Sequence, residues 1–246
     1  GGGEAVAATV GAHLGPGEQI GSTHRPLGHL VAKGCSLKHM MAEIAGKVTG
    51  TNRGKGGPYH IFCPEAGALG ANGIVGGSVP MCAGYALANQ LRANGNVVVS
   101  YFGEGASNQG GVQETLNLAA CWKLPLVFVC ENSSPVVQTM LGHEIDYPQL
   151  SIDDVSLRAP AYGMPGGSYP GWDAEEAYQA VGAAVERART GDGPTLLEFK
   201  VHRVDGEEDE HCPIRRYREK LIEEGVLTEK LDKDIRDQEV AAVKEA

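Results

Sequence analysis

Short apolar runs alternate with longer helical patterns along this chain, and that alternation constrains the fold more than any other feature. Three apolar runs predict strands that are buried on both faces: 95–103, 124–132 and 193–203. Three other segments have the composition and periodicity of helices: 77–95, 111–122 and 174–191. Strands and helices in alternation build parallel sheets, because the connecting helices cover both faces. The sequence therefore predicts an α/β fold with a doubly wound, mostly parallel sheet and helices on both faces.

A change of character near residue 203 predicts two parts of the molecule. The 246 residues are enough for one large domain or for a domain with a tail. Residues 1–203 carry the alternating pattern and predict the α/β domain. Residues 204–246 are strongly charged, and they predict a charged loop followed by a helical C-terminal tail that faces solvent or a partner.

Charge and composition exclude several classes of protein. The formal net charge is −10 and no basic stripe occurs, so we expect no nucleic-acid partner. No apolar run reaches the roughly 18 residues of a membrane span, and the first residues lack the basic flank and apolar core of a signal peptide. Six scattered cysteines without a C-x-x-C pair favour reduced, buried thiols. We therefore expect a cytoplasmic protein that does not bind membranes.

A single carboxylate lies between two glycines where the run 95–103 ends. Gly103 and Gly105 permit a positive φ and a close approach of the backbone to a ligand. The helix that follows offers free N–H groups to an anion, so Glu104 fits a site where Mg²⁺ joins a carboxylate to a phosphate. Alternatively, Glu104 only caps the helix. The next strand ends in a second polar cluster, 131–134, and neighbouring parallel strands lie roughly 5 Å apart, so both clusters could share one ion.

Several longer stretches carry a resemblance to a known family. "STHRPLGHLVAKG", "RGKGGPYHIF", "GANGIVGGSVP", "GEGASNQG" and "LNLAACWKLPLVFVCEN" resemble the α subunit of thiamine diphosphate-dependent 2-oxo acid dehydrogenases of the pyruvate, acetoin and branched-chain types. The resemblance extends from about Gly3 to Arg203. Family members carry several tens of residues ahead of the position where this chain begins. The resemblance implies the thiamine diphosphate-binding fold, with thiamine diphosphate and Mg²⁺ as cofactors.

The same resemblance implies partners and an activity. It implies a β subunit in an α2β2 heterotetramer, a small 2-oxo acid as substrate, and a lipoyl domain or another acyl carrier as acceptor. The family's α subunit holds the diphosphate and the metal, while the β subunit supplies the glutamate that activates the aminopyrimidine. The chain is therefore expected to be an enzyme subunit that is inactive without its β partner.

The resemblance also assigns cofactor-binding residues. His24 and Arg25 take the places that contact the diphosphate, and a guanidinium pairs bidentately with phosphate. Gly73 and Val75 take the places that hold the aminopyrimidine ring. The loop around Glu104 supplies the remaining contacts. They are diphosphate contacts from Gly105 and Ala106, and metal ligands from Glu104, Ser133 and the main-chain carbonyl of Pro135, with Asn132 as a substitute for Ser133.

Three departures from the family pattern lie at the expected site. Leu27 stands where the family has its first histidine, Ser133 stands where it has an asparagine, and Glu207 stands where its mobile loop has a histidine beside the reacting carbon. His211 lies four residues beyond Glu207, and we expect it to take over the catalytic role. Two other histidines lie in well-matched motifs, and we expect them to be structural: His29 and His60.

These departures keep two alternatives open. The chain could be a non-catalytic or regulatory homologue that keeps the fold for assembly. It could also be a specialised carboligase or acyl-transfer enzyme with an acceptor other than a lipoyl domain, because the rebuilt loop at 204–214 borders the acceptor's path in the family.

Overall fold

In a computed structural model, the chain is described at residues 2–133, 139–140, 143–144, 150–202, 204, 206–207 and 209–246. These residues form a sheet of six parallel strands in the order β2-β1-β3-β4-β8-β7. The strands are β1 (Gln19–Ser22), β2 (Ala68–Ala71), β3 (Val98–Gly103), β4 (Leu126–Asn132), β7 (Gly166–Pro170) and β8 (Thr195–Lys200), and β5 (Thr139–Met140) pairs separately with β6 (His143–Glu144). The predicted parallel α/β fold is confirmed.

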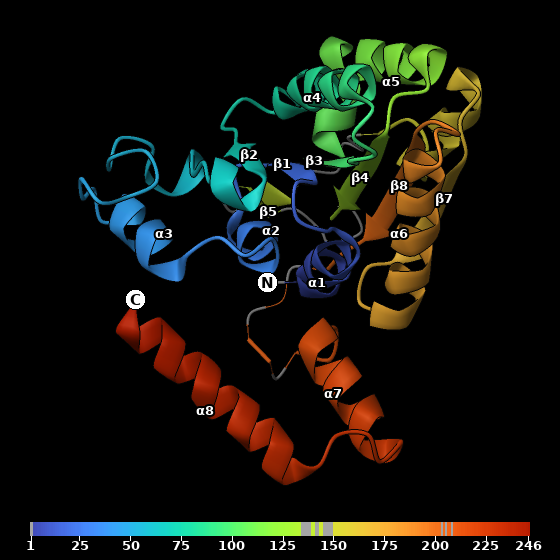
Figure 1. The fold of residues 1–246 in the computed structure, drawn as a ribbon. Helices are drawn as coiled ribbons and strands as arrows, with labels where there is room; N and C mark the ends of the chain where they lie inside the picture. Colours follow the sequence, from blue (N-terminus) through green and yellow to red (C-terminus); the bar gives the residue numbers. More distant parts are fainter. Residues whose placement is uncertain are drawn as a thin grey trace.

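Helices cover both faces of the sheet (Figure 1). The α-helices are α1 (Glu4–His13), α2 (Leu27–Ala32), α3 (Leu37–Ile44), α4 (Ser78–Arg92), α5 (Gly110–Trp122), α6 (Ala174–Arg189), α7 (Pro213–Glu223) and α8 (Glu229–Glu245). Short 3-10 helices are η1 (Gly57–Tyr59), η2 (Pro64–Ala66), η3 (Gly105–Asn108) and η4 (Val155–Tyr162). Helices α4 and α5 pack on one face, whereas α1 and α6 pack together on the other.

The side chains of the central strands alternate between two hydrophobic cores. Val98 and Phe102 of β3 point into the core under α4 and α5, and Val99 and Tyr101 point into the core under α1 and α6. Both sets are fully or almost fully buried. This two-sided burial explains why the strand sequences are continuously apolar and lack polar alternation.

Helix α6 illustrates how the sequence sets an element. Asp173 caps its start by accepting hydrogen bonds from the N–H groups of Glu175 and Glu176, both at 3.0 Å. Its apolar residues recur at helical spacing and are buried against the sheet and α1: Ala177, Ala180, Val181, Ala184, Val185 and Ala188. Gly191 follows the helix with a φ of +83°, a conformation that favours glycine.

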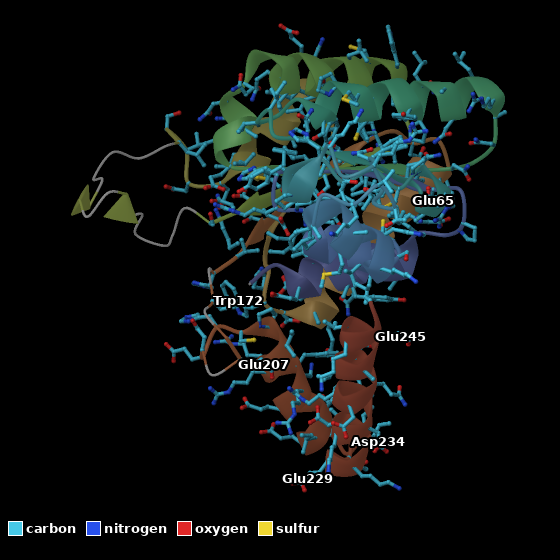
Figure 2. The ribbon with its side chains drawn as sticks, turned by 90° about the vertical axis from the view of Figure 1, so that its left-hand side faces the viewer. Glu65, Trp172, Glu207, Glu229, Asp234 and Glu245 are labelled. Atoms are coloured by element: carbon cyan, nitrogen blue, oxygen red, sulfur yellow. The ribbon has the colours of Figure 1, made fainter. Side chains whose placement is uncertain are left out.

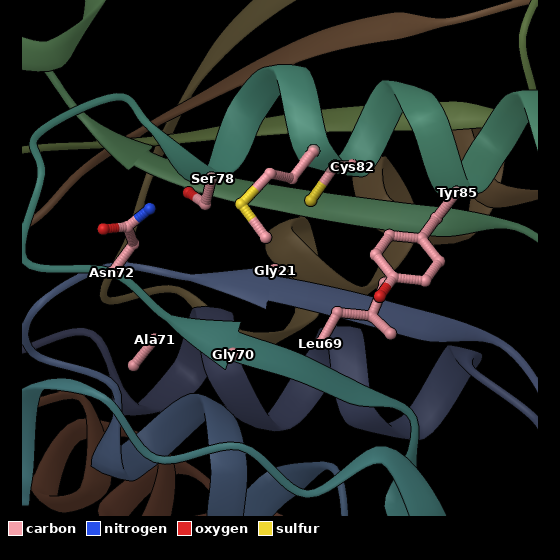
Figure 3. Close-up of a pocket in the computed structure, with 9 residues that line it drawn as sticks. Gly21, Leu69, Gly70, Ala71, Asn72, Ser78, Cys82 and Tyr85 are labelled. Carbon is pink, nitrogen blue, oxygen red and sulfur yellow. The ribbon is translucent and has the colours of Figure 1, made fainter. Parts of the chain in front are cut away.

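Helix α4 lies unusually close to β1. A Cβ atom at Gly21 would collide with the sulfur of Cys82, so only glycine fits at this position. Figure 3 shows the small cavity that remains beside this contact, with Tyr85 and Leu69 near one end and Asn72 and Ala71 near the other. Its volume of about 40 Å³ is too small for a cofactor. The close approach fixes where α4 begins, and that point borders the larger cleft described below.

The C-terminal helices project from the α/β body (Figures 1 and 2). Helix α7 contacts α1, and α8 contacts α3. The Nε atom of Arg218 donates to Asp232 at 2.8 Å, which joins the two tail helices. The predicted boundary at residue 203 stays a prediction. In the described part of the chain, every helix is too short or too polar to cross a lipid bilayer.

Candidate functional site

A large cleft opens where the carboxyl ends of β1, β3, β4 and β8 meet the start of α4. Its volume is about 1290 Å³. Ligands of doubly wound sheets collect at this edge, because the loops that follow the strands converge there. The cleft is lined by seven of the residues that the sequence singled out: His24, Arg25, Val75, Glu104, Gly105, Ala106 and Ser133.

Glu104 and Ser133 meet in this cleft across the ends of β3 and β4. The strand register pairs Gly103 with Glu131, which brings the two following loops side by side. The carboxylate of Glu104 accepts a hydrogen bond from the backbone N–H of Ser133 at 3.2 Å and one from its hydroxyl at 3.3 Å. Both residues are buried, with 7% and 9% of their surface exposed. The expected meeting of two polar clusters at one sheet edge is therefore confirmed.

The alternative reading of Glu104 as a helix cap is wrong. Glu104 precedes η3, but within the described chain its side chain makes no capping hydrogen bond to that turn. The conformational freedom of the flanking glycines is not used either, since neither Gly103 nor Gly105 has a positive φ. The reason is that the chain continues from β3 directly into η3, with Glu104 at φ −56° and ψ −42°, an ordinary right-handed conformation.

Asn132 lies on the other side of the strand end from Ser133. Its Nδ2 atom donates to the carboxylate of Glu198 at 2.6 Å. Glu198 is completely buried and also accepts from the backbone of Ser156 and from Lys200, both at 2.8 Å. Because successive side chains of a strand point to opposite faces, the amide of Asn132 serves this network and Ser133 faces Glu104. This arrangement does not support Asn132 as a metal ligand in place of Ser133.

The oxygen donors of the cleft suit a hard cation with few protein ligands. Among the described residues, no group of three or more His, Cys, Asp and Glu side chains gathers into a metal cluster. Glu104 offers a carboxylate, and the hydroxyl of Ser133 keeps its lone pairs while it donates to Glu104. Mg²⁺ accepts such a set when ligand phosphates and water complete its shell. The third expected ligand, Pro135, lies outside the described residues.

The remaining expected binding residues occupy the rim of the cleft. Arg25 is exposed, and its backbone N–H is held by the hydroxyl of Thr23 at 3.2 Å. The ring of His24 lies 6.4 Å from that of Tyr59. Val75 is 46% exposed. Gly73 does not itself line the cleft as the described residues define it, although its neighbours Asn72 and Ile74 do. A Cβ at Gly73 would approach the ring of His60 to 3.1 Å, so His60 packs against this loop.

His29 is the centre of a buried network in the cleft wall. Its Nδ1 atom lies 2.7 Å from the hydroxyl of Ser22, and its Nε2 atom lies 3.2 Å from the carboxylate of Glu131. The ring stacks on Tyr101 with a centroid distance of 3.7 Å and an angle of 11°. Burial, reinforced by the charge of Glu131, raises the pKa of Tyr101 well above its usual range. His29 is only 4% exposed, which agrees with the structural role expected for it.

The loop histidine expected to be catalytic lies behind the cleft. In the described chain His211 is not part of the lining; its ring packs 4.1 Å from the ring of His202, which does line the cleft. His202 in turn packs 4.7 Å from Trp172. Glu207 does not line the described cleft either, and Arg236 of α8 holds its carboxylate with two hydrogen bonds of 3.1 and 2.7 Å.

Tyr101, Glu131 and His202 are among the cleft residues to which sequence reasoning gave no role of their own. Tyr101 was hidden within an apolar strand, and Glu131 was noticed only as part of a polar cluster. His202 had a usable signal, because it lies two residues after the strand 195–200 and strand ends carry ligand-binding residues in this fold.

Comparison with known proteins gives consistent matches. The sequence profile of the dehydrogenase E1 component family matches residues 1–211. The α subunit of acetoin:2,6-dichlorophenolindophenol oxidoreductase from Bacillus subtilis (strain 168) is 49% identical over 204 residues, which cover 82% of this chain and 60% of that protein. Pyruvate dehydrogenase E1 component subunit alpha from Rhizobium meliloti (strain 1021) is 35% identical over 255 residues, which cover 95% of this chain and 72% of that protein.

The fold has counterparts among solved structures. Transketolase from Campylobacter jejuni subsp. jejuni NCTC 11168 superposes with a TM-score of 0.56 at 18% identity, and the match covers 80% of this chain and 32% of that one. At this identity the likeness concerns the fold alone. The chain spans 60% of the length of the Bacillus subtilis relative.

Proposed function

The chain belongs to the dehydrogenase E1 component family, and from this membership we propose that it is the α subunit of a thiamine diphosphate-dependent 2-oxo acid decarboxylating dehydrogenase. The relatives described above are α subunits of an acetoin oxidoreductase and of a pyruvate dehydrogenase E1 component, which supports this class of activity. A cytoplasmic location is part of the proposal and is supported by the six free cysteines.

The meeting of Glu104 and Ser133 in the cleft is the observation that carries the proposal. A buried carboxylate beside a hydroxyl, at the carboxyl ends of two neighbouring parallel strands, is a site for a cation that also binds phosphate oxygens. In our proposal Glu104, Ser133 and the carbonyl of Pro135 hold Mg²⁺. The ion would supply positive charge beside the diphosphate of the cofactor.

The other expected residues bind the rest of the cofactor. Arg25 and His24 contact the diphosphate from the rim, and the backbone of Gly105 and Ala106 approaches it from the start of η3. The loop with Gly73 and Val75 supports the aminopyrimidine ring. A cleft of about 1290 Å³ leaves room for a cofactor and a small 2-oxo acid together.

When bound, thiamine diphosphate supplies a carbon nucleophile and accepts the electrons of the carbon–carbon bond that breaks. The chain's own contribution is to orient the cofactor and to keep water away from one side of the cleft. Glu104 and Arg25 fix the charged end of the cofactor, and the buried wall that contains Tyr101 and His29 excludes water from one side of the cleft.

A β subunit completes the site in our proposal. Apolar side chains rim the cleft with large exposed fractions: Leu27 45%, Tyr59 55%, Ile74 74% and Val75 46%. Exposed apolar groups around a ligand cleft favour a protein partner that covers them. We propose a β subunit in an α2β2 heterotetramer, and a lipoyl domain or another acyl carrier as the acceptor.

Reconstitution tests the proposal directly. The chain is co-expressed with a candidate β chain from the same genome, and CO₂ release from pyruvate and from branched 2-oxo acids is measured with and without thiamine diphosphate and Mg²⁺. We expect release that depends on both cofactors and on both chains. No cofactor-dependent release from any of these substrates would refute the activity.

A non-catalytic homologue is the second candidate. It is favoured by Leu27 at the rim and by Glu207, whose carboxylate is bound by Arg236 and stays outside the lining of the described cleft. Titration calorimetry of the αβ assembly separates the two candidates, because a purely structural subunit has no reason to bind thiamine diphosphate in a metal-dependent way. A carboligase or acyl-transfer enzyme with a non-lipoyl acceptor would bind both cofactors. Product analysis with alternative acceptors would identify it.

A further inference from the structure

The cleft contains few groups that exchange protons near neutral pH. An imidazole is the side chain whose ordinary pKa lies closest to neutral pH, so the histidines are the first candidates for proton transfer in the cleft. Three histidines line the described cleft: His24, His29 and His202. Both ring nitrogens of His29 are occupied, by Ser22 and Glu131, and the ring is buried. His24 lies beside Arg25 at the end that we assign to the diphosphate.

His202 differs from the other two histidines because neighbouring rings pack against it while, within the described chain, its ring nitrogens stay accessible to a ligand. It lies two residues after the end of β8, and the N–H of Val201 before it donates to the carbonyl of Asn132 at 2.9 Å. This bond holds His202 at the edge of the sheet where β4 also ends. Trp172 and His211 pack against its ring at centroid distances of 4.7 and 4.1 Å. Among the residues that the structure describes, no hydrogen bond engages either ring nitrogen of His202.

The surroundings of His202 favour its neutral form. Partial burial is the largest cause that lowers its pKa below the usual 6.5, followed by the positive charges of His211 and Arg216, and Asp209 opposes them weakly. Arg216 comes from α7 and lies 5.7 Å from the ring of Trp172, while Asp209 and His211 come from the loop before α7. A neutral imidazole at working pH accepts protons.

We propose that His202 is the proton acceptor of the cleft, and that Trp172 and His211 position it. This inference rests on the proposed function and deepens it. When a hydroxyl derived from the substrate's carbonyl returns to the carbonyl form, its O–H bond would break, the electron pair of that bond would form the C=O bond, and the proton would bind a ring nitrogen of His202. The electron pair of the bond that breaks at the same carbon would be accepted by bound thiamine diphosphate, which would supply the electron sink. The proton then leaves to solvent or returns to the product. His211, which the sequence suggested as the catalytic histidine, acts through His202.

The first test replaces the ring of His202 in the assembled αβ enzyme. We expect His202→Gln to lower kcat by about 100-fold or more, since a well-placed general base contributes about 10²–10⁴ in rate. Thiamine diphosphate affinity, measured by calorimetry on the same assembly, should change less than twofold (about 0.4 kcal/mol). His39→Gln, which removes an exposed imidazole on α3 outside the cleft lining, is the matched control and should leave kcat unchanged.

The second test uses the pH profile, which a purely structural role would not move. His211→Gln and Arg216→Gln each remove a positive charge near His202, so the pKa of His202 rises in each variant. Because the neutral imidazole is the active form, the acidic limb of kcat/KM should move to higher pH in both variants. In His202→Gln that limb should be lost.

The outcomes separate this inference from the proposed function. If the wild-type assembly is active and His202→Gln keeps at least half of kcat with an unchanged acidic limb, His202 is not the base, and the function stands. If His202→Gln folds poorly, the other two variants decide. An acidic limb of kcat/KM that stays at the wild-type pH in both His211→Gln and Arg216→Gln overturns the inference. A wild-type assembly without thiamine-dependent activity overturns both.

Discussion

The side chains of the cleft differ in how firmly the fold holds them. Glu104 is buried and takes two hydrogen bonds from Ser133, whereas Arg25 is exposed and, within the described part of the chain, is held through its backbone N–H alone. A preorganised carboxylate loses little freedom when a cation binds, but a mobile guanidinium must be ordered at that moment. We therefore expect Glu104 to contribute more to cofactor affinity than Arg25 does.

Glu104→Gln tests this expectation. The substitution keeps the size and removes the charge, so we expect the metal-dependent affinity of the αβ assembly for thiamine diphosphate to fall at least about tenfold, or about 1.4 kcal/mol. Calorimetry with and without Mg²⁺ measures the effect. Glu114→Gln, an exposed carboxylate on α5, is the control and should bind like the wild type. Equal affinities for Glu104→Gln and the wild type would remove Glu104 from the metal site.

At this scale the sequence was informative wherever a motif lay at a strand end. Glu104 and Ser133 were found from the sequence because each directly follows a buried strand. The network of Ser22, His29 and Glu131 could not be found in the same way, because Glu131 is 102 residues from His29 in the sequence and only the sheet brings them together. The orientation of Asn132 also needed the structure, since Glu198 is its partner on a different strand.

Among the elements, the loop between α3 and η1 is organised by one carboxylate. Glu43 is fully buried and accepts from four backbone N–H groups at 2.6 to 3.2 Å: Asn52, Gly54, Gly56 and Gly57. Burial alone would raise the pKa of Glu43, but these four donors outweigh it and hold the pKa below its usual 4.5. The loop leads to Pro58 and Tyr59, which line the cleft.

Glu43→Gln should therefore destabilise the fold in a pH-dependent way. The amide cannot satisfy all four donors, so we expect the free energy of unfolding to fall by about 2 kcal/mol or more at neutral pH. A depressed pKa means that the contribution is complete above about pH 5 and is lost as the pH falls through the folded-state value. Urea unfolding of both proteins from pH 7 to pH 3.5 measures this, and a difference that grows on acidification would contradict the assignment.

Glu18 connects three elements of the α/β body. Its buried carboxylate accepts from the N–H of Val97 ahead of β3 at 3.3 Å and from Arg189 of α6 at 2.8 Å. We expect Arg189→Ala to lower the free energy of unfolding by about 1–3 kcal/mol, because the charge on Glu18 then loses its main partner while Arg189 is partly exposed. Arg92→Ala, at the exposed end of α4, is the control. Equal urea midpoints for the two variants would show that the pair contributes little.

Long, periodic elements were predictable, and short ones were not. The runs 95–103, 124–132 and 193–203 correspond to β3, β4 and β8, and the predicted helices correspond to α4, α5 and α6. The strands β1, β2 and β7 escaped notice because they are four or five residues long and contain glycine or proline. These short segments become strands because neighbouring strands of the sheet pair with them, although their own sequences have weak strand propensity.

For the whole molecule, we propose that residues 1–203 form the cofactor domain and residues 204–246 form a separately mobile tail. Ion pairs join the parts of the tail to one another, among them Arg218 with Asp232 and Arg236 with Glu207, and Lys220 pairs with Glu175 of α6. Helix α8 has no buried residues. Exposed ion pairs are screened by salt. The body instead depends on two apolar cores, which salt does not weaken.

Hydrogen exchange should separate the two parts. We expect the amides of α8 to exchange faster in about 0.5 M NaCl than in about 0.1 M NaCl, where the Debye lengths are about 4 Å and about 10 Å. The amides of β3 and β4 should be unaffected. Asp232→Asn should accelerate exchange in α8 at low salt, because Arg218 loses the charge of Asp232 and Arg236 keeps only its pair with Glu207. Uniform protection across α8 and the sheet in all conditions would mean that the chain behaves as one unit.

The packing of Trp172 gives the protein a built-in optical reporter. The chain has two tryptophans: Trp172 lies against His202 at the cleft, and Trp122 ends α5 outside the lining of the described cleft. A protonated imidazole in contact with an indole quenches its emission more than a neutral one does. Removing Trp122 would thus leave a single fluorophore whose brightness follows the charge on His202, so that occupancy of the cleft could be watched in real time without any label.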